Sequence, residues 1–334
     1  MRRATALCLA AAAVSVVADR GDTPAPRFAN VFQAHMVLQR NQPLKLWGPG
    51  TPTAGLRVCL ATDCAAVAAS PGGGWAATLP ARPASATPLE LSLGAVQTLR
   101  DVVIGDVFLF SGQSNIDLPQ SYAHQLYTPK LAGCQPQNDT NRMCSSFNSS
   151  AQDDTEQLAD RMGKRSGLLR LMIVAAPPAA GNSTPALELP ESPDCPPCPS
   201  PSTPYVACGC DAMKWARANA SNVRGFSATA WFSGAALLSL GAKATAGVPI
   251  GLIRSSMGGT QIQLWSSPAA LRKCGPTTAK RFWRPYSSLF ANMIVPMSGL
   301  GFAGLTWYQG EANTGPDNPQ PLNWGTGPTG VSAV

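Results

Sequence analysis

The chain has 334 residues, of which 45% are hydrophobic and 13% are charged. This composition suits one large globular domain or two ordinary ones, and it excludes a mostly disordered chain. The formal net charge is +7, but Lys and Arg are scattered without a dense basic run, so no nucleic-acid partner is indicated.

The first 18 residues have the layout of a secretory signal. Arg2 and Arg3 precede an apolar stretch that runs from Ala4 to about Ala18, with small residues at its end. The stretch is short for a membrane span, which needs about 20 apolar residues. We therefore expect a signal peptide over 1–18, rather than a weak buried helix, and a secreted or lysosomal protein with no membrane segment after signal removal.

Glycosylation sequons and cysteines agree with export. Sequons begin at Asn138, Asn148, Asn182 and Asn219. Nine cysteines lie outside the signal, and in an oxidising compartment they predict disulfides. The odd count leaves one thiol unpaired or paired with another chain. The nine are Cys59, Cys64, Cys134, Cys144, Cys195, Cys198, Cys208, Cys210 and Cys274.

Residues 19–100 read as a small N-terminal β domain. Short alternating runs such as "PLKLWGPG", "LRVCLATDC" and "GGGWAATLP" are separated by Gly, Pro and Asp, as in strands joined by tight turns. Cys59 and Cys64 are spaced to close a hairpin. A small sandwich or open barrel is predicted, and nothing in it suggests chemistry.

From residue 101 to 313 the pattern changes to strands that alternate with helices. "DVVIGDVFLF", "VPIGLI" and "GFAGLTWY" read as buried strands, and helices are expected within 224–247 and 286–297. This order predicts an α/β domain with a parallel sheet covered on both faces. Trp265 and Trp307 are expected to pack in its core.

Two segments do not fit the sheet. Residues 175–211 hold ten of the 31 prolines, so they predict a surface insertion, and we favour disulfides over a zinc site for its four cysteines because no histidine is near. Residues 314–334 are rich in Gly and Pro, and they predict a disordered tail.

Three predicted strands are each followed at once by a polar, glycine-containing stretch. "VFLF" leads into "SGQSN", "IGLI" into "RSSMGGT" and "AGLTW" into "YQGEAN". The carboxyl ends of parallel strands share one edge of a sheet, where ligand sites form. We therefore expect one cleft to contain the following residues: Ser114, Gly258, Gly259, Gln309, Glu311 and Asn313.

Such a cleft can hydrolyse an ester. A serine hydroxyl attacks the carbonyl carbon, and donors preorganised around the carbonyl oxygen stabilise the oxyanion. Glycines allow backbone N–H groups to come close, and side-chain amides add donors. The serine needs a base, usually a histidine held by an aspartate, to take its proton.

These stretches resemble the sialate O-acetylesterases, which are serine esterases of the SGNH type. "VFQAHMVLQRNQPLKLWGPG", "IGDVFLFSGQSN", "VPIGLIRSSMGGTQIQLWSS" and "GLTWYQGEAN" match four blocks of that family in order. The resemblance implies a three-layer SGNH-hydrolase-like domain and an O-acetylated sugar as substrate. The sequence itself contains no cofactor motif and no clear metal site. It leaves the oligomeric state open.

The resemblance also implies roles for the residues. Ser114 would be the nucleophile; its N–H, one glycine of the Gly258–Gly259 pair and the Gln309 amide would form the oxyanion hole. Glu311 and Asn313 would shape the site, and whether Asn313 also donates to the oxyanion stays open.

The family's catalytic base is missing from the expected place. It should lie in an Asp-x-x-His block well beyond the third motif, yet the histidines of this chain are His35 and His124. We expect neither to replace it. The sequence thus predicts an esterase domain without its C-terminal part and with little or no activity. The alternatives are a catalytically silent glycan-binding protein, an acetylxylan-type esterase fragment, or a non-functional gene product.

Overall fold

The structure is a computed structural model, and it describes the strands that precede the three motifs. The described residues are 24–71, 73–120, 167–176, 189, 214–239, 247–273 and 285–314. Among them, no helix is long and apolar enough to cross a membrane. Several sequence predictions fall outside these residues: the signal peptide, His124, three of the sequons (Asn138, Asn148 and Asn182), seven of the cysteines, almost all of the 175–211 insertion, and the tail beyond Thr314.

Strand β8 (Gln97–Gly112) is the centre of the fold. The described residues form a nine-stranded sheet in the order β10-β9-β11-β8-β7-β3-β4, in which β1 and β12 also pair with β8. Strands β1, β9, β11 and β12 run parallel to β8, whereas β7 runs antiparallel to it. The bounds are β1 Val37–Gln39, β3 Arg57–Leu60, β4 Asp63–Ala66, β7 Ser85–Leu93, β9 Leu169–Ile173, β10 Ala216–Arg217, β11 Ile250–Ser256 and β12 Gly304–Tyr308.

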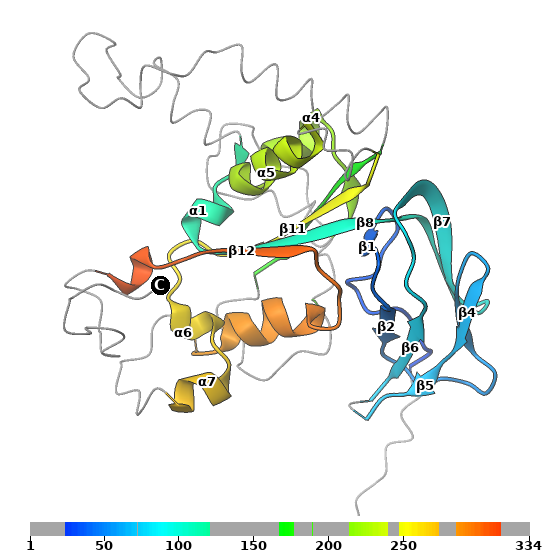
Figure 1. Cartoon of the computed structure of the whole chain (residues 1–334). Helices are drawn as coiled ribbons and strands as arrows, with labels where there is room; N and C mark the ends of the chain where they lie inside the picture. The colour runs from blue at the N-terminus through cyan, green and yellow to red at the C-terminus, as the bar shows by residue number, and fades with distance from the viewer. Residues whose placement is uncertain are drawn as a thin grey trace, which may run out of the picture.

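The N-terminal β region contains a second sheet in the order β2-β6-β5, which lies beside β3, β4 and β7 (Figure 1). Its strands are β2 (Leu44–Gly48), β6 (Trp75–Leu79) and β5 (Ala68–Ala69). Alternate side chains of β2 and β6 are buried, as expected for strands with one face on a core.

The predicted hairpin bond is confirmed. Cys59 on β3 and Cys64 on β4 are register partners and form a disulfide. It closes a loop with a sequence separation of 5 between the two cysteines.

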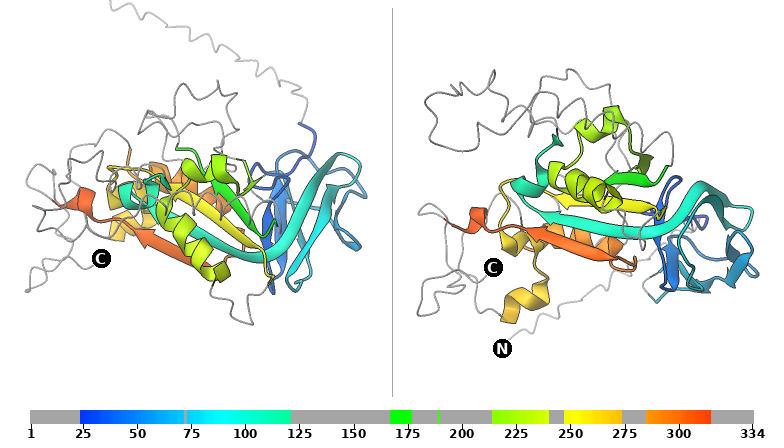
Figure 2. Two further views of the ribbon diagram at one scale, coloured as in Figure 1. Left: turned by 90° about the horizontal axis from the view of Figure 1, so that it is seen from above. Right: turned by 45° about the horizontal axis from the view of Figure 1, so that its top comes forward.

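Strand β8 also crosses the expected boundary between residues 100 and 101. Figure 2 shows it continuing as one curved strand from the α/β sheet into the N-terminal β region. Arg40 reinforces this connection, because its Nε and Nη2 donate to the two carboxylate oxygens of Asp106 at 2.8 and 2.9 Å. The two regions thus share one backbone element and are not joined by a linker.

Helices cover both faces of the sheet (Figure 1). On one face lie α1 (Ser114–Asp117), α4 (Ala220–Arg224) and α5 (Ala228–Ser239); on the other lie α6 (Ile262–Trp265), α7 (Pro268–Lys273) and the orange helix that contains residues 290–297. The predicted α/β class is confirmed, although the sheet is mixed. Trp265 packs edge-on against Trp307 at a centroid distance of 5.7 Å, in line with the expected core packing.

The expected helix over 286–297 departs from regular α geometry. Its middle is a π-helix, η2 (Phe290–Ile294), followed by a 3₁₀ turn, η3 (Val295–Met297). Pro296 explains the change, because it has no N–H to donate and its ring disturbs the preceding turn. Asn219, the described sequon, caps α4 by accepting the Asn222 N–H at 3.1 Å.

Candidate active site

Three strands end side by side at one edge of the sheet. Gly112 at the end of β8 pairs with Ser256 at the end of β11 and with Tyr308 at the end of β12. The polar stretches that follow these strands therefore leave the sheet at the same edge. This is the convergence that the sequence predicts for parallel strands.

Ser114 begins helix α1 directly after β8 and is partly exposed. The turn that presents it requires glycine at position 112, where φ is +139° and a Cβ atom would lie 2.1 Å from the Tyr308 carbonyl oxygen. Within the described part of the chain, the Ser114 hydroxyl has no hydrogen-bond partner.

Gly258 lies next to Ser114. A Cβ atom at position 258 would be 3.7 Å from the Ser114 Cβ and 3.7 Å from the Asp117 carboxylate. The Gly258 N–H donates to Asp117 Oδ2 at 3.4 Å. Gly259 is exposed and has a φ of +67°, a conformation that favours glycine. The structure therefore brings both glycines of the second motif to the loop beside Ser114.

Gln309 is buried, and its amide faces other polar groups of the site. Its Nε2 lies 2.6 Å from Asn313 Oδ1, 3.2 Å from the Thr260 carbonyl oxygen and 3.3 Å from Gln113 Oε1. The amide hydrogens already have protein acceptors in this structure. Donation to an oxyanion would require one of these hydrogen bonds to be exchanged.

Glu311 and Asn313 each hold a neighbouring segment. Glu311 Oε2 accepts a hydrogen bond from Gln113 Nε2 at 2.7 Å. Asn313 Oδ1 accepts the Ile262 N–H at 2.9 Å, and its Nδ2 donates to Gln263 Oε1 at 2.9 Å. Asn313 thus connects the end of β12 to the start of α6.

Sequence reasoning missed three residues of this site: Gln113, Asp117 and Arg254. Gln113 Oε1 accepts hydrogen bonds from the Ala312 N–H at 3.1 Å and the Gly310 N–H at 3.4 Å. Gln113 therefore joins the first motif to the third. Its position beside Ser114 was the only signal in the sequence.

Asp117 and Arg254 join the first motif to the second. Asp117 Oδ1 lies 3.1 Å from Arg254 Nη1 and accepts the Ser256 hydroxyl at 3.1 Å. The Arg254 side chain is 6% exposed. Burial lowers the pKa of its guanidinium, and the charge of Asp117 opposes this effect.

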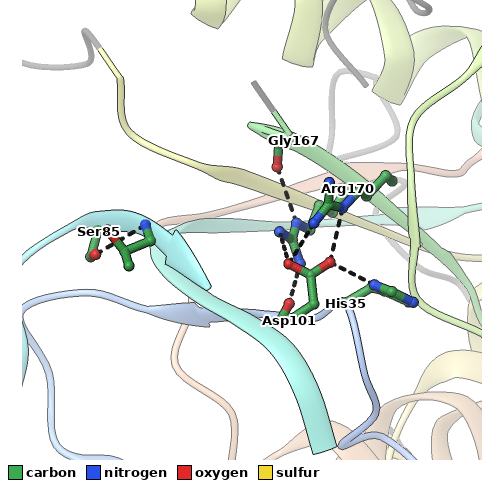
Figure 3. A network of polar contacts seen from close by, with 7 residues as sticks. His35, Ser85, Asp101, Gly167 and Arg170 are labelled. Carbon is green, nitrogen blue, oxygen red and sulfur yellow. Dashed lines mark hydrogen bonds and ion pairs between the residues drawn. The ribbon is translucent and has the colours of Figure 1, made fainter. Parts of the chain in front are cut away.

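The described histidine lies at the other end of β8. His35 Nδ1 is 2.6 Å from Asp101 Oδ2, and Arg170 contacts the same carboxylate (Figure 3). Arg217 also contacts this carboxylate. Positions 101 and 112 are separated by about 35 Å along an extended strand. His35 is therefore too far away to act on Ser114.

The Asp101 cluster is an ion-pair network rather than a reactive pair. Burial would raise the pKa of the Asp101 carboxyl, but hydrogen bonds from its three basic neighbours outweigh this and hold the pKa well below its usual range. Arg170, with a side chain 1% exposed, also donates to the Gly167 carbonyl oxygen at 3.1 Å and to the Asp101 carbonyl oxygen. Over the described residues, no group of three or more His, Cys, Asp or Glu side chains could hold a metal ion.

Comparisons with known proteins point to one family. Residues 209–321 match the model of a carbohydrate esterase family described as sialic acid-specific acetylesterase. This range contains the second and third motifs. The chain is 28% identical over 327 residues to the human sialate O-acetylesterase, with 89% of this chain and 50% of the relative covered. It is 27% identical over 337 residues to the mouse enzyme of that name, with 86% and 52% covered.

A solved structure agrees on the fold. A carbohydrate acetylesterase from Xanthomonas citri superposes with a TM-score of 0.58 at 24% identity, covering 86% of this chain and 52% of that one. The chain spans about half the length of the curated relatives it matches. The resemblance to the sialate O-acetylesterase family is confirmed.

Proposed function

Because the chain matches the sialate O-acetylesterase family, we propose that its site is that of a carbohydrate esterase that removes O-acetyl groups from sialic acids. Ser114 would be the nucleophile. The convergence of the three motif-bearing strand ends at Gly112 is the observation that supports this proposal. An acetate ester held there would place its carbonyl between α1 and the Gly258–Gly259 loop.

The proposed oxyanion hole uses donors on both sides of that carbonyl. The Ser114 N–H lies at the free amino end of α1, where helix N–H groups have no partner within the helix. The Gly258 or Gly259 N–H and the Gln309 amide would complete the set, with Glu311 and Asn313 shaping the loops. Loss of one such donor typically costs about 10²–10³ in rate.

We propose that acetate release by this chain is slow. The described residues place no histidine near Ser114, and the chain contains only His35 and His124. A serine hydroxyl without a base to take its proton is a weak nucleophile. We also propose export, on the basis of the signal-like residues 1–18.

The test is an acetate-release assay on an O-acetylated sialic acid, with acetylated xylan in a parallel sample. We expect slow release from the sialic acid that Ser114→Ala abolishes. Equal release by Ser114→Ala would contradict the proposal. Saturable sugar binding without release would instead support the silent glycan-binding protein, which the absence of a histidine near Ser114 among the described residues favours.

A further inference from the structure

Asp117 connects helix α1 to the loop after β11. Its carboxylate forms an ion pair with the Arg254 guanidinium at 3.1 Å. It also accepts hydrogen bonds from the Ser256 hydroxyl at 3.1 Å and the Gly258 N–H at 3.4 Å. Its backbone carbonyl also accepts from Arg254 Nη1 at 3.3 Å. Both parts of one residue are thus fixed to the end of β11.

The position of Asp117 in α1 gives this contact a bearing on Ser114. The helix has 4 residues, with Ser114 first and Asp117 last. The Asp117 N–H donates to the Gln113 carbonyl oxygen at 2.9 Å, and the Leu118 N–H donates to the Ser114 carbonyl oxygen at 2.8 Å. In a helix this short, fixing the last residue fixes the first.

Arg254 supplies the rigid support. It lies on β11, between β8 and β9, and its side chain is 6% exposed. A buried guanidinium requires a counter-charge, because an unpaired charge away from water is unfavourable. Asp117 is the carboxylate that contacts it, so the pair stays formed and its position is set by the central sheet.

We infer that Asp117 is a positioning residue that fixes the distance between Ser114 and the Gly258–Gly259 loop. The inference rests on the proposed function, since it gives this distance a catalytic role. It also assigns a resting partner to the Gly258 N–H. An oxyanion at the site would compete with the carboxylate for that N–H, or would use the N–H of Gly259.

The contacts of Asp117 separate positioning from a general structural role. Removing a residue that only stabilised the fold would lower the unfolding free energy and raise the exchange rate of every amide in the region by a similar factor. Loss of a positioning residue instead speeds amide exchange in the loop 257–259 more than in the strand β11 beneath it. In kinetics, it lowers kcat and leaves KM nearly unchanged, because the reacting atoms are misplaced and the sugar contacts are kept.

The experiment compares Asp117→Ala and Asp117→Asn with Asp106→Asn in the full chain. Asp106 is a matched control, since it is a carboxylate of β8 that is 13% exposed and is paired with Arg40, away from the site. Amide hydrogen exchange of residues 250–260 and acetate release are measured for each protein, together with thermal unfolding.

For Asp117→Ala we expect about a tenfold or greater increase in exchange at residues 257–259, a smaller increase along β11, where Arg254 loses its counter-charge, and a fall in kcat of about 10- to 100-fold. Asp117→Asn keeps one acceptor oxygen, so it should lie between Asp117→Ala and wild type. Asp106→Asn should change neither quantity. Unchanged exchange at 257–259 in Asp117→Ala, or an equal change in Asp106→Asn, would overturn the inference. If the wild-type chain releases no acetate, the proposed function fails, and the exchange measurement still decides whether Asp117 holds the loop.

Discussion

Gln113 and Glu311 lie 198 positions apart in the sequence, and the Gln113 Nε2 donates to Glu311 Oε2 at 2.7 Å. The other end of the same amide accepts hydrogen bonds from the loop that follows β12. A single buried side chain beside Ser114 therefore holds the third motif in place. The hydrogen bonds of this one side chain thus join the first motif directly to the third.

Replacing Gln113 with alanine should destabilise the chain. Gln113 is 1% exposed, and its removal takes an acceptor from the Gly310 N–H and a donor from the Glu311 carboxylate. Buried polar groups left unsatisfied cost about 1–3 kcal/mol each, and we expect a total loss of about 2–3 kcal/mol by urea unfolding. Gln42→Ala is the control, because Gln42 is exposed and makes a single bond of 3.4 Å to the Phe302 carbonyl oxygen. An equal loss in both variants would contradict the prediction.

The order of the elements at the site could be predicted from the sequence. The apolar runs at 101–110, 248–253 and 301–308 correspond to β8, β11 and β12 because buried parallel strands read as continuous apolar segments. The shared edge of such strands then brings the three motifs together. The Cys59–Cys64 bond was also predictable, since a short spacing within a hairpin leaves few other partners.

The contacts within the site could not be predicted in this way. The partners of Gln113, Asp117 and Arg254 depend on which neighbour each loop contacts after its strand ends. The spacing of apolar residues along the chain does not encode this. For the same reason, the sequence does not predict that β1 pairs with β8 or that β8 continues into the N-terminal β region. The change in residue pattern near residue 100 predicts a domain boundary, whereas β8 runs through this position as one strand.

Alanine substitutions should show which of two site glycines, Gly112 or Gly258, the fold itself requires. At Gly112 a Cβ atom would lie 2.1 Å from the Tyr308 carbonyl oxygen, whereas at Gly258 the nearest atoms would be at 3.7 Å. Gly112→Ala should therefore cost more than about 1 kcal/mol of stability. Gly258→Ala should change stability by less than about 0.5 kcal/mol.

Thermal and urea unfolding of the two glycine variants provide the measurement. Gly55→Ala is a useful third protein, because Gly55 has a φ of +78° and no atom within 4 Å of an added Cβ. It isolates the cost of the left-handed backbone from that of the steric contact. A stability for Gly112→Ala no lower than that for Gly55→Ala would show that the contact with Tyr308 relaxes freely.

Removing the hairpin disulfide should weaken the N-terminal β region. Replacing Cys59 and Cys64 with serine opens a loop with a sequence separation of 5. Chain-entropy arguments give about 2 kcal/mol for a loop of this size. The urea midpoint of the double variant measures this loss. A midpoint equal to that of the wild type would contradict the prediction.

Asp101→Asn should be among the most destabilising single changes in the described sheet. It removes the charge that pairs with Arg170, whose side chain is 1% exposed. Breaking a buried ion pair by removing one partner costs about 3–5 kcal/mol, and we expect the lower end because Arg170 keeps two carbonyl partners. Asp63→Asn is the control, since Asp63 pairs with Arg82 and is 34% exposed. Exposed pairs of this kind contribute about 0–1 kcal/mol.

The same substitution should change how stability depends on pH. The pKa of the Asp101 carboxyl is held below its usual range in the folded chain, whereas the pKa of an unfolded aspartate is about 3.9. Its contribution is therefore complete above the unfolded pKa and is lost as the pH falls through that value toward the folded pKa. At low pH a protonated Asp101 resembles Asn. The difference in urea midpoint between wild type and Asp101→Asn should thus be large at about pH 6 and should shrink at about pH 3. A difference that stays constant between these two pH values would show that the charge of Asp101 does not stabilise the fold.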